Sequence, residues 1–205
     1  MTLGHEFLLR EIGVRPTIGW HLDPFGHSSA QPYLFSEMGF EAWFFARMQY
    51  QDQDYRTKHQ ELEFMWTPLG KQDSSLFTHL MYGPLYCIPE GFTWDQLGSE
   101  DEIVEDSRLE GYNVERLANQ FVKDALEKRA GYRHPEVLFP MGCDFHFQNA
   151  HLNYRNMDRL IAAVNKASKG RVQVQYATPS SYMAAVKKHS EVTFPTNYWD
   201  FFTYA

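Results

Sequence analysis

The sequence predicts an α/β fold with a mostly parallel sheet or partial barrel, because short apolar segments alternate with stretches of helical periodicity. Residues 42–46 form a continuous apolar run, which is typical of a strand buried on both faces. Residues 114–129 place apolar side chains three and four positions apart, the spacing of an amphipathic helix. The chain opens on what reads as the last turns of a helix, so we expect residues 1–205 to form a single partial domain.

In the first half of the chain, helical spacing predicts a helix over residues 5–12, ended by Gly13, and a short one over residues 30–38. The polar stretch at residues 51–61 reads as a solvated helix or loop. The segment at residues 82–95 is rich in glycine, proline and aromatic residues, like a loop at an active-site wall. Short apolar runs predict strands at residues 16–20, 42–47, 62–67 and 75–81.

In the second half, the acidic stretch at residues 99–110 is expected at the surface. Further helices are predicted over residues 114–129, 153–166 and 179–188, the last of them beginning at a proline, which a first helical turn tolerates. Residues 135–141 and 172–176 read as two more strands.

Three charged residues follow predicted strands: Asp23, Arg47 and Asp144. In parallel α/β folds the functional residues lie at the carboxyl ends of the strands. Two carboxylates and an arginine on one such edge favour glycoside hydrolysis, which needs an acid and a second carboxylate. We expect apolar neighbours to bury Asp144 partly and so raise its pKa as the acid, while Asp23 stays ionised. A metal-dependent hydrolase of another kind remains open at this point.

Composition excludes several other classes. The formal net charge is −7 without a block of Lys or Arg, which argues against binding of nucleic acid. No apolar run is long enough to span a membrane. Cys87 and Cys143 are the only cysteines, too few for a disulfide framework, and they leave the redox compartment undecided.

The stretch from Trp20 to Ser28, Trp-His-Leu-Asp-Pro-Phe-Gly-His-Ser, resembles the nucleophile motif of the class II α-mannosidases, glycoside hydrolase family 38. In its details the sequence is most similar to the lysosomal, acid-active branch of that family. The similarity runs over nearly the whole chain and continues at residues 38–40, 44–47, 50–52, 76–78, 141–145, 178–179 and 200–205.

The resemblance implies a role for five residues. Asp23 would be both the catalytic nucleophile and a zinc ligand, and Asp144 the general acid/base. Phe25, Arg47 and Tyr86 would contact the substrate. The implied mechanism is retaining, through a mannosyl ester of Asp23 that water cleaves.

The resemblance also implies a zinc ion that binds mannose hydroxyls, mannose-containing N-glycan oligosaccharides as substrates, and a lysosomal or other acidic secretory compartment. The family's remaining zinc ligands are histidines and an aspartate that we expect outside this segment. The chain would thus be the central part of a larger catalytic α/β domain, with the rest of the parent polypeptide as its partner, and inactive by itself.

Two alternatives stay open. The chain could be a zinc-free fragment that at most binds carbohydrate through its aromatic residues. It could also come from a metal-dependent carbohydrate deacetylase, which would need two further histidine ligands; His79, His146 and His151 lie near the proposed edge. One departure from the family pattern is Cys143, which stands directly before Asp144 where Ser or Asp is expected.

Overall fold

The computed structural model describes residues 1–67, 72–83, 86–95 and 101–202 of the chain. Contacts between residues divide the chain into two compact units. The first unit comprises Met1–Leu85 and Pro179–Ala205, and the second comprises Tyr86–Thr178. Each unit has its own helices and its own buried side chains.

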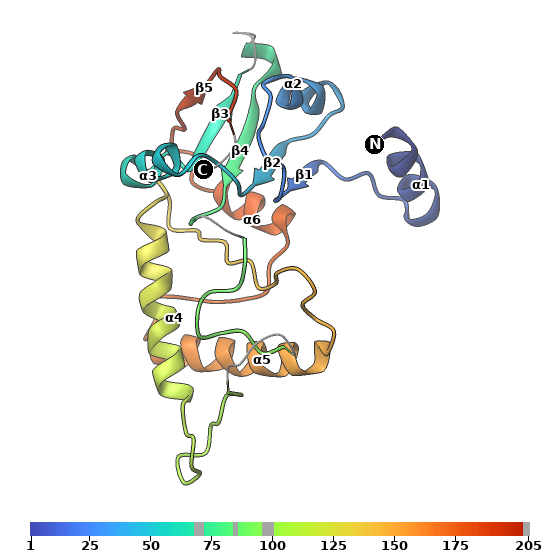
Figure 1. The fold of residues 1–205 in the computed structure, drawn as a ribbon. Coiled ribbons are helices and arrows are strands. Elements are labelled where there is room, and N and C mark those ends of the chain that lie inside the picture. The colour runs from blue at the N-terminus through green and yellow to red at the C-terminus, as the bar shows by residue number, and fades with distance from the viewer. Residues whose placement is uncertain (68–71, 84–85, 96–100, 203–205) are drawn as a thin grey trace. The chain divides into compact units, whose positions relative to one another are not determined.

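The first unit is built on a mixed, mostly parallel sheet with the strand order β1-β2-β4-β3-β5 (Figure 1). Parallel pairs join β1 to β2, β2 to β4 and β3 to β5, whereas β3 and β4 run antiparallel. The prediction of an α/β fold with a mostly parallel sheet is therefore confirmed. The strands are β1 (Ile18–His21), β2 (Ala42–Phe45), β3 (Glu63–Trp66), β4 (Leu76–Leu80) and β5 (Thr196–Asn197).

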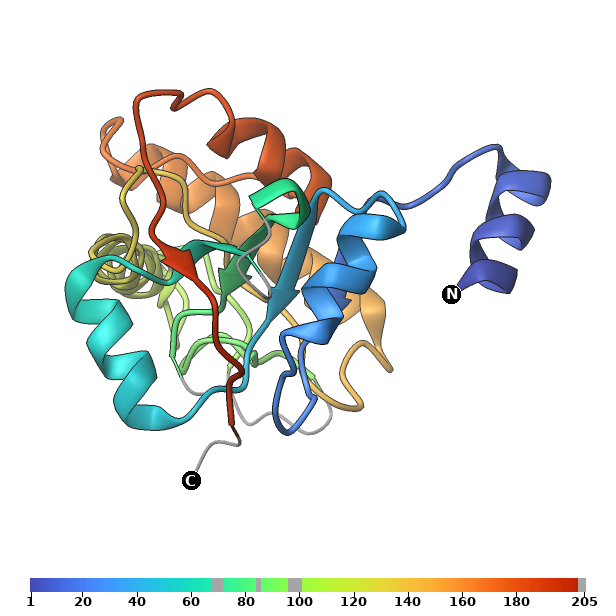
Figure 2. The ribbon, with the colours of Figure 1, turned by 90° about the horizontal axis from the view of Figure 1, so that it is seen from above.

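The helices of the first unit are α1 (Thr2–Ile12), α2 (Ala30–Glu37), α3 (Tyr50–His59), the short η2 (Gln72–Ser74) and α6 (Pro179–Val186). Helix α1 buries none of its residues, and Figures 1 and 2 show that it stands away from the sheet. It ends as predicted at Gly13, whose φ of 70° is left-handed and therefore favours glycine.

Aromatic side chains fill the core of the first unit. Every residue of β2, which lies inside the sheet between β1 and β4, is buried. Trp43 stacks on Trp66 with ring centroids 5.4 Å apart. Helix α2 packs closely on β1, since a Cβ added to Gly19 would lie only 2.7 Å from the ring of Phe35.

A buried polar network joins α6 to the sheet. Tyr182 of α6 donates a hydrogen bond to Glu63 Oε1 over 2.8 Å, and His79 Nδ1 lies 2.8 Å from the same oxygen. Glu63 and His79 face each other across the antiparallel pair of β3 and β4. A buried carboxylate requires such partners, because desolvating it alone would cost several kcal/mol or more.

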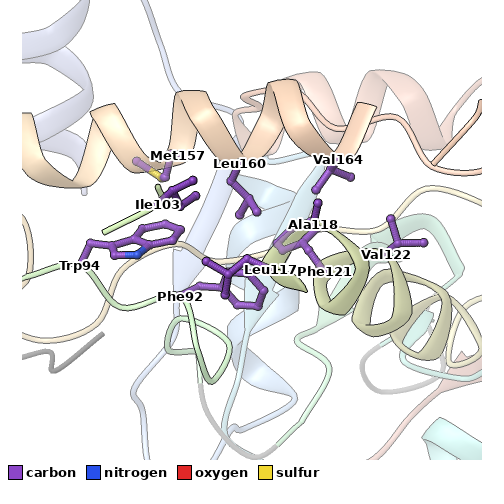
Figure 3. Close-up of a cluster of buried hydrophobic side chains, with 10 residues drawn as sticks. All are labelled: Phe92, Trp94, Ile103, Leu117, Ala118, Phe121, Val122, Met157, Leu160 and Val164. Carbon is purple, nitrogen blue, oxygen red and sulfur yellow. The ribbon is translucent and has the colours of Figure 1, made fainter. Parts of the chain in front are cut away.

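The second unit centres on α4 (Val114–Arg129) and α5 (Ala150–Ala167), which pack against each other. Figure 3 shows Leu160 and Val164 of α5 pointing toward the apolar face of α4. Phe92 and Trp94 complete the cluster from the segment that precedes the helices. Its buried members are Phe92, Trp94, Ile103, Leu117, Ala118, Phe121, Val122, Met157, Leu160 and Val164.

Two predicted strands are wrong: residues 135–141 and 172–176 are not strands. In the first, Pro135 and Pro140 lack the N–H groups that a sheet would use, and Phe139 packs on the α4–α5 cluster instead. In the second, the side chain of Asn165 takes the place of a strand partner. Its amide donates to Val174 O over 2.9 Å, and its oxygen accepts from Val174 N over 2.7 Å.

Candidate active site

Asp23 lies two residues beyond β1, in the loop that leads to α2. Pro24 follows it and favours an extended backbone at Asp23. Arg47, two residues beyond β2, donates a hydrogen bond from Nε to Asp23 Oδ1. β1 and β2 are parallel neighbours, so both residues leave the sheet at the same edge. The predicted placement of Asp23 and Arg47 at strand ends is confirmed.

The surroundings of the two groups differ. The Asp23 side chain is 49% exposed, whereas that of Arg47 is 15% exposed. The guanidinium carbon of Arg47 also lies 4.8 Å from the centre of the Phe25 ring, within range of a cation–π contact. Phe25 itself is exposed. Arg47 thus orients the Asp23 carboxylate and the Phe25 ring, and both groups are accessible to a ligand.

The loop is also held from the inside of the unit. His27 is buried, and its Nε2 donates to the carbonyl oxygen of Arg47 over 2.9 Å. Because a carbonyl can only accept, Nε2 carries the proton. Desolvation by burial lowers the pKa of His27. This hydrogen bond opposes the shift in part, and nearby His21 lowers the pKa further. His27 is therefore neutral at neutral pH and supports the loop without adding charge.

The C-terminal segment of the described chain holds the same loop. His27 and Phe201 exchange backbone hydrogen bonds of 2.7 and 2.8 Å. Ser29 N donates to Asp200 Oδ1 over 2.6 Å, and this bond lowers the pKa of the Asp200 carboxyl. Ser29 and Asp200 lie 171 positions apart in the sequence, so their hydrogen bond could not be predicted. Only the resemblance of residues 200–205 to the family indicated a role for this segment. Residues 203–205 of that motif lie outside the described residues.

A second group of candidate residues lies in the second unit. The hydroxyl of Tyr86 donates a hydrogen bond to Asp144 Oδ1 over 3.3 Å. Asp144 is exposed, so the partial burial expected from its apolar neighbours is wrong. It does not follow a strand either, since residues 135–141 form none. The structure brings Asp144 together with Tyr86, and Asp23 together with Phe25 and Arg47, in different units.

A disulfide joins the segments that carry Tyr86 and Asp144. Cys87 and Cys143 are bonded, with their Cα atoms 4.6 Å apart. This pairing was not predicted, because two cysteines separated by 56 positions give no periodic or spacing signal. The available signal was their positions: each cysteine is the direct neighbour of a candidate site residue.

No complete metal site exists within residues 1–67, 72–83, 86–95 and 101–202, where no three His, Cys, Asp or Glu side chains gather. Zinc in proteins takes at least three protein ligands. Asp23 by itself therefore does not fit a zinc centre. His79 was predicted to lie near the site from its position in the sequence, but it is buried and lies against Glu63.

In the described part of the chain no helix has the length and apolarity to cross a membrane.

Fold and site together define a class: an α/β protein in which the exposed Asp23 carboxylate, at the end of a parallel strand, lies beside Arg47 and the exposed ring of Phe25. The family model for the N-terminal domain of family 38 glycosyl hydrolases matches residues 1–205. The chain belongs to this family.

Similar proteins agree with this assignment. The lysosomal alpha-mannosidase of Dictyostelium discoideum is 43% identical over 91% of this chain and 18% of its own length. The human lysosomal alpha-mannosidase is 38% identical over the whole chain and 21% of its own length. The chain thus spans about a fifth of these relatives. The crystal structure of an alpha-mannosidase from Enterococcus faecalis shares the fold, with a TM-score of 0.64, 17% identity, and coverage of 95% of this chain and 19% of that one.

Proposed function

We propose that this chain provides the two carboxylates of a retaining α-mannosidase. Asp23 is the nucleophile and Asp144 the general acid/base, while Phe25, Arg47 and Tyr86 contact the sugar. The observation that carries the proposal is the half-exposed Asp23 carboxylate, oriented by Arg47 beside the exposed Phe25 ring in a chain of family 38.

The reaction follows from these roles in two steps. Asp23 attacks the anomeric carbon while Asp144 gives its proton to the departing glycosidic oxygen, so that a carbon–oxygen bond forms as another breaks. A water molecule then attacks the anomeric carbon of the ester, gives its proton to Asp144 and releases the Asp23 carboxylate. Two inversions leave the configuration of the released mannose unchanged.

The neighbours of each carboxylate support these roles. Arg47 is less exposed than Asp23, so its guanidinium is a fixed partner that holds the nucleophile in one orientation. The Phe25 ring offers an apolar surface for the hydrogen-bearing face of a sugar. Tyr86 touches Asp144 and so lies where the leaving group would depart.

The proposal of a zinc ion is based on membership of the family alone. We assign Asp23 as one ligand of a zinc ion that binds mannose hydroxyls, with the other ligands from sequence outside these residues. Residues 1–205 would accordingly be the central part of a larger catalytic domain, and the isolated chain would not hydrolyse mannosides. The chain covers about a fifth of the length of its relatives, and this supports the assignment.

The substrates of the complete polypeptide, meaning these residues with any flanking sequence, would be α-linked mannose residues of N-glycan oligosaccharides. Its compartment would be the lysosome or another acidic secretory compartment. The names of the relatives support α-linked mannose as the substrate and the lysosome as the compartment. A disulfide supports the second, because structural disulfides are typical of the secretory pathway.

The test is the hydrolysis of aryl α-mannosides by the complete polypeptide, with the configuration of the first-formed sugar followed by NMR. We expect α-mannose as the first product. Asp23→Asn should lower kcat/KM by about 10⁴-fold or more, because no other group replaces the nucleophile. Asp54→Asn changes an exposed carboxylate of α3 in the same way and should leave the rate unaltered. β-Mannose as the first product, or full activity in Asp23→Asn, would contradict the proposal.

A further inference from the structure

The segment that carries Asp144 has a backbone that needs external support. Phe145 and Phe147 have φ values of 62° and 64°, in the left-handed region that bulky residues rarely adopt. The segment also folds back on itself, since a Cβ added to Gly142 would lie 3.3 Å from the Phe147 ring. Such conformations persist only where the surrounding structure fixes them. Asp144 and Phe145 are exposed, so packing of their own side chains does not supply that support.

One support lies on the N-terminal side of Asp144. The disulfide joins Cys143, the residue before Asp144, to Cys87, the residue after Tyr86. The bond therefore restrains the backbone at both ends of the hydrogen bond between the Tyr86 hydroxyl and Asp144 Oδ1. Because that hydrogen bond is exposed and 3.3 Å long, it is too weak to hold the two segments together by itself.

A second support lies on the C-terminal side. Asp95 is a buried carboxylate whose Oδ2 accepts the backbone N–H of Phe147 over 2.5 Å. The same oxygen accepts Nδ2 of Asn153 over 2.8 Å, and Asn153 is a buried residue of α5. Hydrogen bonds to a charged group are the stronger ones. Asp95 thus ties the end of the segment to a helix that is itself packed in the core of the second unit.

We infer that the Cys87–Cys143 disulfide and Asp95 form a clamp that positions Asp144 for proton transfer. This inference rests on the proposed role of Asp144 as general acid/base. Proton transfer requires the carboxyl group within hydrogen-bond reach of the glycosidic oxygen, and a displacement of about 1 Å can cost about 100-fold in rate. The clamp fixes the backbone on both sides of the acid while its side chain stays exposed to the substrate.

A clamp that only stabilised the fold would affect every substrate alike. If the clamp positions the acid, its loss should lower the rate most for substrates whose leaving group must be protonated. Dinitrophenolate departs without a proton, whereas the sugar alkoxide of a mannobiose cannot. The parameter kcat/KM reports the steps up to formation of the mannosyl ester, so a comparison of these two substrates isolates the acid-catalysed step.

The experiment uses the complete polypeptide and both substrates. In the Cys87→Ser/Cys143→Ser variant, kcat/KM for mannobiose should fall by about 10- to 100-fold, and that for dinitrophenyl α-mannoside should stay within about twofold of wild type. Dithiothreitol, which reduces the disulfide to two thiols and is itself oxidised to a cyclic disulfide, should reproduce this pattern in wild type. The double variant should give the same substrate ratio with and without dithiothreitol.

Asp95→Ala tests the other end of the clamp and leaves the disulfide intact. If the cysteine variant does not fold, this variant alone tests the inference. It should show the same selective loss on mannobiose. Asp101→Ala is the matched control, because it removes an exposed carboxylate of the same unit. Circular dichroism verifies that each variant is folded.

An unchanged substrate ratio in the folded variants, or an equal fall on both substrates, would overturn the clamp. Asp144→Asn separates this result from a failure of the proposed function. It should lower kcat/KM for mannobiose by at least about 100-fold and spare dinitrophenyl α-mannoside. If Asp144→Asn shows no such selectivity, the acid/base role itself is wrong; if it does and the clamp variants do not, only the clamp is wrong.

Discussion

Arg47 connects the residues of the first candidate group, because its guanidinium contacts Asp23 and Phe25 while its carbonyl oxygen accepts a hydrogen bond from His27. A lysine in its place would keep the charge. It would lose the planar group that can bond a carboxylate and lie over a ring at the same time. The geometry around Asp23 should therefore depend on arginine and not merely on positive charge.

We expect Arg47→Lys to lower kcat/KM of the complete polypeptide by about 10- to 100-fold, since hydrogen bonds to charged groups contribute about 1.5–3 kcal/mol. Arg108→Lys is the matched control, because Arg108 forms an exposed ion pair with Asp106 in the other unit. Steady-state kinetics with an aryl α-mannoside measure both. Wild-type activity in Arg47→Lys would show that charge alone suffices.

His27 makes the stability of the first unit depend on pH. Its lowered pKa means that the folded state binds a proton less readily than the unfolded chain does. The stabilisation is complete above the unfolded pKa of about 6.5 and is lost as the pH falls through the lower folded value. The free energy of unfolding should thus decrease on acidification, by at most about 1.4 kcal/mol per pH unit for one group.

His27→Gln tests this dependence, because a glutamine amide can still donate to the Arg47 carbonyl but does not titrate. Urea unfolding at a series of pH values gives the free energy of unfolding of both proteins. We expect the advantage of wild type over the variant to shrink on acidification. A difference that is constant with pH would show that His27 does not titrate on unfolding in this range.

Among the elements, helix α4 shows how far periodicity predicts a buried face. Its predicted bounds match the structure, and Leu117, Phe121, Val122 and Ala125 are buried as expected. Leu126 was predicted on the same face but is 47% exposed. Leu126 follows Leu117 by nine residues, about two and a half helical turns, so the two side chains point to opposite sides of α4. Leu126 therefore lies at the edge of the apolar face and not at its centre.

The two leucines of α4 therefore form a matched pair for mutation. Leu117→Ala should lower the free energy of unfolding by about 2–5 kcal/mol, because it leaves a cavity among buried side chains. Leu126→Ala makes the same chemical change at an exposed site and should cost about 0.5 kcal/mol or less. Thermal or urea unfolding followed by circular dichroism measures both. Equal losses would contradict the packing described for α4 and α5.

Elements that depend on distant partners were the ones that sequence reasoning missed. Residues 135–141 and 172–176 have the apolar character of strands, but side chains of both segments pack against the α4–α5 cluster. In the second segment, Asn165 supplies the hydrogen bonds to Val174 that a neighbouring strand would otherwise provide. Strand β5 was not predicted, since its two residues pair with β3 from far along the chain. By contrast, β2 was predictable, because a sheet centre selects continuous apolar runs.

At the scale of the whole molecule, the site residues were predictable as types but only partly as an arrangement. The motif around Asp23 specified the carboxylate, and the strand-end rule brought Arg47 beside it. The same rule wrongly placed Asp144 at the end of a strand. Asp144 instead lies in a loop that a disulfide and Asp95 hold in place. Tertiary hydrogen bonds and disulfide pairings leave no local pattern in a single sequence.

The residues that the structure describes also supply too few ligands for zinc, which leads to a prediction for metal binding. The isolated chain should show no saturable binding of zinc at micromolar concentration in calorimetry, because one carboxylate cannot hold the ion. The metal-free complete polypeptide should bind zinc and lose it to chelators together with its activity, and added zinc should restore both. Tight zinc binding by the isolated chain would contradict the assignment of the other ligands to flanking sequence.

The central claim is that Asp23 is the nucleophile, and covalent trapping tests it most directly. A fluorinated mannosyl substrate with an activated leaving group forms the ester faster than water cleaves it, so the complete polypeptide accumulates as mannosyl-enzyme. Peptic digestion and mass spectrometry then locate the label. We predict one fluoromannosyl group on the peptide with Asp23 and none in Asp23→Asn. A label on any other residue, or turnover without a covalent intermediate, would contradict the claim.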